Sequence, residues 1–122
     1  MHRETEVAGG KEPDIIVSSI SAPCQIAIEV KHANRSWSVR ALDKALQKQL
    51  AGDYLRPISR QHGVFVITLH KKRKWRHPET NTSMSFNALV SHLRETALKL
   101  VMHATGHPIA VQVMGIDASS DI

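Results

Sequence analysis

The sequence predicts an α/β domain built on a mixed β-sheet with one helix on either side. Two observations lead to this fold class. Short runs rich in β-branched residues recur along the chain, and between the later runs lie two segments whose apolar residues repeat at helical spacing. A hairpin would make the sheet antiparallel near its start, and each helix would cross over to a parallel strand. The predicted order is β-β-β-α-β-α-β, in one domain of residues 1–122.

The first three predicted strands include a β-hairpin. Residues 3–7 alternate in polarity and end at the flexible pair Gly9-Gly10. The runs 14–17 and 25–31 are apolar and rich in β-branched residues, and the turn-forming residues 18–23 join them. These two runs are therefore expected to pair as antiparallel neighbours.

The first predicted helix is amphipathic and about four turns long, and Pro57 ends it. Its apolar positions are Leu42, Ala45, Leu46, Leu50 and Tyr54. The run Val64–Leu69 follows, and its nearly continuous hydrophobicity predicts a central strand buried on both faces.

The second predicted helix begins after Ser85 and is followed by Gly106 at the position of a left-handed C-terminal cap. Its apolar positions are Phe86, Leu89, Val90, Leu93, Ala97, Leu100 and Val101. Residues 109–114 are expected to form the last strand, and residues 117–122 a frayed tail.

Composition and charge restrict the class of protein. The 122 residues are 42% hydrophobic and 22% charged, which is ordinary for a globular domain. No apolar run approaches the about 20 residues that cross a bilayer, and no signal peptide is apparent, so a soluble cytoplasmic protein without a membrane partner is expected. Cys24 is the single cysteine, which excludes an internal disulfide. Sixteen Lys and Arg against 11 Asp and Glu leave a net charge of +5, which favours a polyanionic partner.

Three residues of the predicted hairpin form a candidate catalytic site. Glu29 and Lys31 lie two apart on a strand, so both side chains leave the same face. With the turn centred between Ser21 and Ala22, Asp14 stands opposite Glu29, with β-carbons about 4.5–5.5 Å apart. Two such carboxylates repel each other, and a divalent cation removes the conflict.

A metal site would follow from this arrangement. Mg²⁺ prefers hard oxygen ligands and commonly binds one or two carboxylates plus substrate phosphates. Asp14, Glu29 and the backbone carbonyl of Val30 would supply those oxygens, and Mn²⁺ is a candidate substitute. Lys31 would orient the attacking water or stabilise charge at phosphorus. Taken singly, Asp14 could instead be a turn residue after Pro13, and Glu29 with Lys31 a solvated pair on an edge strand.

Asp14, the hairpin and the strand Ile28-Glu29-Val30-Lys31 resemble the PD-(D/E)XK nuclease superfamily, which includes restriction endonucleases, Holliday junction resolvases and RecB-type nucleases. The resemblance implies a restriction-endonuclease-like fold in which Asp14 and Glu29 bind the metal and Lys31 is catalytic. Gln49 and Tyr54 resemble the Gln and Tyr signature of RecB-like members, where the Gln lies near the active site. The same features resemble compact nuclease domains at the C-termini of large bacterial defence proteins.

The resemblance covers residues 3–75 by motifs and residues 85–115 by pattern alone. Many relatives carry a further acidic residue on a helix before the first strand, and the chain starts too late for that helix. Glu4 or Glu6 is the candidate replacement, or the chain is a piece of a longer protein.

A basic segment follows the predicted central strand and is a candidate nucleic-acid contact. It carries five positive charges around one aromatic ring, a composition that suits phosphate contacts and stacking. Its members are Lys71, Lys72, Arg73, Lys74, Trp75 and Arg76. The alternative interpretation is a solvated loop with Trp75 inside a local core.

The functional prediction is a Mg²⁺-dependent nuclease that hydrolyses phosphodiester bonds by in-line attack of water, with DNA favoured over RNA as substrate. The alternative is a catalytically inactive relative that binds nucleic acid or a partner protein. A homodimer is a further hypothesis, because cutting both strands of a duplex requires two sites.

Overall fold

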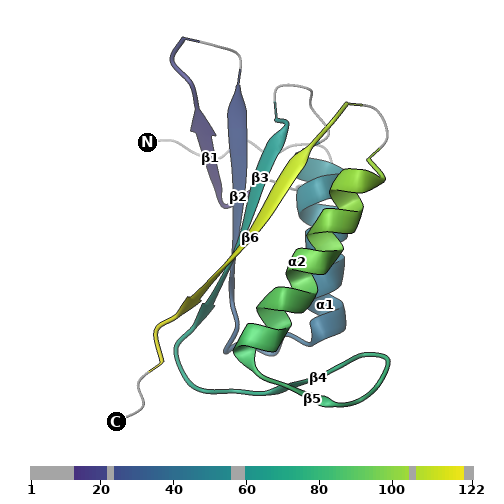
Figure 1. Cartoon of the computed structure of the whole chain (residues 1–122). Coiled ribbons are helices and arrows are strands. Elements are labelled where there is room, and N and C mark those ends of the chain that lie inside the picture. Colours follow the sequence, from purple (N-terminus) through teal and green to yellow (C-terminus); the bar gives the residue numbers. More distant parts are fainter. Residues whose placement is uncertain (1–12, 22–23, 56–59, 105–106, 120–122) are drawn as a thin grey trace.

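The computed structural model describes residues 13–21, 24–55, 60–104 and 107–119. Its main sheet has four strands in the order β1-β2-β3-β6: β1 (Ile15–Ser18), β2 (Gln25–His32), β3 (His62–Leu69) and β6 (Ala110–Asp117). The β1 and β2 strands are antiparallel, whereas β3 runs parallel to both β2 and β6 (Figure 1). The α/β class and the mixed sheet are therefore confirmed, and the strand expected over residues 3–7 lies outside the described residues.

Both helical segments cover the same face of the sheet, so the expectation of a helix on either side is wrong. A β-carbon added at Gly63 would lie 3.0 Å from the Leu50 side chain, and one at Gly115 would lie 2.6 Å from Val90 of the second helix. Gly63 pairs with Val111, which is four residues from Gly115, so the two glycines share a face. The reason is handedness. The strands β2, β3 and β6 follow one another in one direction, and right-handed crossovers then place both helices on one side.

The central strand β3 is consequently buried on one face only. Its residues alternate between buried and half-buried, which corrects the prediction that both of its faces are covered. The core lies between the sheet and the helices, with Phe65 and Ile67 fully buried. The opposite sheet face is apolar and partly open. Its most exposed aliphatic side chains, each 45–48% exposed, are Ile15, Val17, Met114 and Ile116.

The first helical segment is α-helical only at its start. Ser38 caps α1 (Val39–Lys44) by accepting a hydrogen bond from the amide of Ala41, and a π-helix, η2 (Ala45–Tyr54), continues the segment. All five predicted apolar positions are buried, as expected for the core-facing side. The wider π-helical turn also buries Leu55, whose amide donates to the Leu50 carbonyl five residues earlier. Pro57, the predicted end, lies outside the described residues.

A small hairpin that the sequence did not predict stands between β3 and the second helix. It pairs β4 (Trp75–Arg76) with β5 (Ser83–Met84), and Asn81 in its turn takes a left-handed φ of 59°, which Asn tolerates. The hairpin puts part of the predicted basic loop into regular structure.

The second helix, α2 (Phe86–Met102), begins where predicted, and Ser85 caps it through the amide of Ala88. It ends earlier than predicted, with His103 as its C-cap, and Gly106 lies outside the described residues. The last strand is longer than expected, because Leu69 pairs with Asp117 and the ladder continues past Met114. The start of the predicted frayed tail is therefore strand. Within the described residues, no helix has both the length and the apolarity to span a membrane.

Candidate active site

The hairpin register brings Asp14 beside Glu29, as predicted. The pairing of Ile15 with Ile28 and of Ile16 with Ala27 places Asp14, one residue before β1, opposite Glu29. The carboxylate is anchored there, since Asp14 Oδ2 accepts a hydrogen bond of 2.8 Å from the Val30 amide. In a hairpin the connecting turn sets the register, so this pairing of Asp14 with Glu29 does not need contacts from other parts of the chain.

Glu29 and Lys31 form a largely buried ion pair on the helix-facing side of β2. Lys31 Nζ lies 2.8 Å from Glu29 Oε2, and the two side chains are 11% and 6% exposed. The other oxygen, Glu29 Oε1, is buried without a hydrogen-bond partner. The solvated edge pair considered from the sequence is thus wrong, because Glu29 is the one buried charged residue among those described.

Burial is the dominant influence on the Glu29 carboxyl. Loss of hydration raises the pKa of Glu29 above its ordinary value, while the hydrogen bond and charge of Lys31 oppose this and the charge of Asp14 adds to it. An incompletely paired carboxylate in a buried position costs free energy unless another group compensates it. Such perturbed groups concentrate at functional sites.

Trp37 also belongs to this site, through a contact with Lys31. Lys31 Nζ lies 4.8 Å from the centre of the Trp37 ring, which makes a cation–π contact. The Trp37 carbonyl accepts hydrogen bonds from Arg73 and from the Trp75 indole. No periodicity in the sequence could reveal these contacts, because residues 36 to 38 positions apart make them.

The basic segment after β3 divides into structural and exposed residues. Arg73 donates to the carbonyls of Ala33, Arg35 and Trp37, and its guanidinium lies 4.8 Å from the centre of the Trp75 ring. Trp75 is only 4% exposed, so its ring supports the local core, as the alternative interpretation held, and presents no face to a base. The exposed basic residues of the segment are Lys71, Lys72, Lys74 and Arg76.

Asn34 also ties the loops after β2 and β3 together. Its side-chain oxygen accepts from the amides of His70 and Lys71, and its side-chain nitrogen donates to the Lys71 carbonyl. Arg73 and Asn34 therefore hold the segment that carries Trp37 at the carboxyl ends of two parallel strands. In open α/β sheets, ligands commonly bind at that end.

Gln49 lies on η2, which packs against β2 and β3. Its side-chain oxygen is buried and has no hydrogen-bond partner, so this oxygen can accept a hydrogen bond from a further group. Tyr54, the other residue of the resemblance, is 4% exposed and belongs to the core cluster, as its helical spacing suggested.

The residues at the site fit a divalent cation only as an open site. The orphaned oxygen of Glu29 and the carboxylate of Asp14 are hard donors of the type that Mg²⁺ prefers. The Val30 amide points toward Asp14, and the carbonyl of a strand residue points to the same side as its amide. Among the described residues, however, no three His, Cys, Asp or Glu side chains form a group that could hold a metal ion. Substrate and water oxygens would have to complete the coordination.

The chain was compared with protein-family models, with curated proteins and with solved structures, and nothing matches it in any of the three.

Proposed function

We propose that this chain is a divalent-metal-dependent nuclease domain of the PD-(D/E)XK class, acting on DNA in preference to RNA. The observation that carries the proposal is the pairing of Asp14 with Glu29 beside Lys31, with one Glu29 oxygen buried and unpartnered. A buried carboxylate in this state is expected where a cation completes the site during function.

In the proposed reaction, a water oxygen bonds to phosphorus while the bond from phosphorus to the leaving sugar oxygen breaks. The water loses a proton to solvent and the leaving oxygen gains one, without a covalent enzyme intermediate. A bound metal would lower the pKa of the attacking water and stabilise the negative charge that develops at phosphorus. Asp14, Glu29 and the Val30 carbonyl would hold it.

Lys31 has a separate role in this proposal. Glu29 and the Trp37 ring restrain its ammonium group, which can therefore remain oriented without losing much side-chain entropy on substrate binding. Its charge would stabilise the transition state at phosphorus. Gln49 is proposed to accept a hydrogen bond from the attacking water through its unpartnered side-chain oxygen.

A second candidate function is an inactive nuclease-like domain that binds nucleic acid. The observation that favours it is the absence, among the described residues, of a third acidic side chain beside Asp14 and Glu29. Glu4 and Glu6, the candidate replacements, lie outside the described residues. The homodimer stays a prediction, and sedimentation of the purified chain tests it.

The experiment that separates the two functions is cleavage of supercoiled plasmid with Mg²⁺, with Mn²⁺ and with EDTA. Lys31→Met keeps an apolar side chain of similar length and removes the charge, whereas Glu95→Gln alters an exposed carboxylate on α2 as a control. We expect nicking by the wild type and by Glu95→Gln with either metal, and none by Lys31→Met. Intact plasmid with the folded wild type under every condition would reject the nuclease and favour the binding function.

A further inference from the structure

A long groove lies between the first helical segment and α2, away from the candidate active site. Its volume is about 1180 Å³, and residues of α1, η2 and α2 form its walls. Pro78 and Glu79 of the β4–β5 turn and His107 and Ile109 before β6 also line it. The candidate-site residues Asp14, Glu29, Val30, Lys31 and Gln49 are not part of its lining.

One wall of the groove carries a regular row of cations. Arg40, Lys44 and Lys48 recur every four residues, and all three line the groove and are exposed. Lys99 stands on the opposite wall, on α2. Within the described part of the chain, no ion pair joins these four side chains to a carboxylate.

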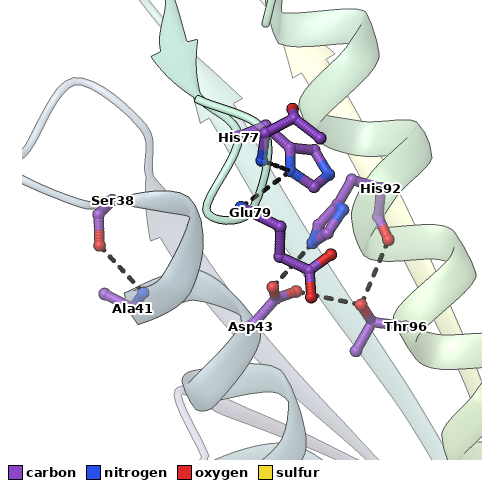
Figure 2. Close-up of polar contacts among 8 residues, drawn as sticks. Ser38, Ala41, Asp43, His77, Glu79, His92 and Thr96 are labelled. Atoms are coloured by element: carbon purple, nitrogen blue, oxygen red, sulfur yellow. Dashed lines mark hydrogen bonds and ion pairs between the residues drawn. The ribbon is translucent and has the colours of Figure 1, made fainter. Parts of the chain in front are cut away.

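The acidic residues of the groove do not balance this row. The carboxylate of Asp43 is already hydrogen-bonded within the protein. It accepts hydrogen bonds from His92 at 2.7 Å and from Thr96 at 3.1 Å, as Figure 2 shows. Glu79 is the other carboxylate of the lining. Among the described residues of the lining, two carboxylates face four cations, so this part of the groove attracts anions even when its histidines are neutral.

We propose that this groove binds the sugar-phosphate backbone of nucleic acid without reading its sequence. Its volume exceeds the roughly 300–1,000 Å³ of typical small-molecule pockets, and its cations form a row instead of converging on one point. Such a row matches an extended polyanion better than a single phosphate group. The described residues of the lining include no Trp, Tyr or Phe and so provide no platform for base stacking. Affinity therefore comes from the phosphates and depends steeply on salt.

This proposal does not depend on cleavage, because none of the groove residues belongs to the candidate active site. The test is fluorescence anisotropy of a labelled single-stranded oligonucleotide, and of the matching duplex, in EDTA at several salt concentrations. One variant combines Arg40→Gln, Lys44→Gln and Lys48→Gln, since glutamine preserves helix propensity. A comparison variant removes the same charge from the basic segment after β3, the competing candidate for nucleic-acid contact, through Lys71→Gln, Lys74→Gln and Arg76→Gln, all at exposed positions.

We expect the groove variant to lose about three phosphate contacts. For a single strand, this loss makes the negative slope of log K against log salt less steep by about 2 and lowers the affinity at 0.1 M salt by about 100-fold. The comparison variant should lose at least tenfold less affinity, because the proposal places the phosphate contacts in the groove and not on the basic segment after β3. Equal losses in the two variants would show that only net charge matters, and absence of binding by the wild type would also overturn the proposal.

A second measurement keeps the test decisive if the triple variant does not fold. The wild-type chain, at 13.6 kDa, is small enough for amide-resolved NMR titration with the unlabelled oligonucleotide. Shifts concentrated in residues 40–52 and 92–103 support the groove. Shifts confined to the loops after β2 and β3 overturn it.

Discussion

Glu29→Gln gives the most direct test of the metal site, through the effect of Mg²⁺ on thermal stability. A ligand that binds only the folded chain at ten times its Kd adds about 1.4 kcal/mol to the free energy of unfolding. For a domain of this size that raises Tm by about 5 °C. The substitution keeps the shape of the side chain but leaves Asp14 as the one carboxylate of the described site.

A tenfold weaker Kd in Glu29→Gln reduces the gain at the same Mg²⁺ concentration to about 0.4 kcal/mol, or about 1.5 °C. In Lys31→Met, Mg²⁺ should raise Tm more than in the wild type. The ammonium group of Lys31 lies 2.8 Å from Glu29 Oε2 and repels a cation there, and the substitution removes that charge. Glu95→Gln, at an exposed position, should behave as the wild type. Differential scanning fluorimetry up to about 20 mM Mg²⁺ or Mn²⁺ measures these shifts. Equal rises in wild type and Glu29→Gln would refute the assignment of the site.

Comparing the wild type with Glu29→Gln in the absence of metal also tests how Glu29 makes the stability of the fold depend on pH. Burial raises the pKa of Glu29 above its ordinary value of 4.5, so the folded chain retains a proton that the unfolded chain releases. The contribution of Glu29 to stability is therefore complete below pH 4.5 and is lost as pH rises through the raised pKa. Urea unfolding in EDTA should show the stability of the wild type, relative to Glu29→Gln, falling with pH in that window. A relative stability that rises with pH would contradict the reasoning.

Two further predictions concern the contacts that hold the helices and loops in place. Asp43→Ala removes the acceptor shared by His92 and Thr96 and should lower the free energy of unfolding by about 1–3 kcal/mol, whereas Glu95→Ala should change it by less than about 0.5 kcal/mol. Arg73→Lys cannot reproduce the contacts with three carbonyls and should cost about 1.5–3 kcal/mol in urea unfolding. Lys74→Ala, next to it but exposed, should leave stability unchanged, and a loss as large as that of Arg73→Lys would disprove the structural role.

Local sequence patterns were enough to predict the elements that carry the candidate site. The period-two alternation of β2 placed Glu29 and Lys31 on one face, and the position of the turn placed Asp14 opposite Glu29. These relations are local, because the pleat and the hairpin turn fix them within a few residues. The helix α2 was equally predictable, since its apolar spacing persists over several turns.

The arrangement of those elements depended on tertiary structure. Sequence spacing could not show that both crossovers proceed in the same direction across the sheet, which leaves the face of Ile15 and Met114 partly open. The charge of Arg73 suggested a phosphate contact, but its carbonyl partners lie 36 to 40 positions away in the chain. The groove likewise lies between two helical segments that are far apart in the sequence, and the hydrogen bond between Asp43 and His92 joins them across 49 positions. A pattern within one segment specifies which face of it is apolar, and only long-range packing decides which other segment covers that face.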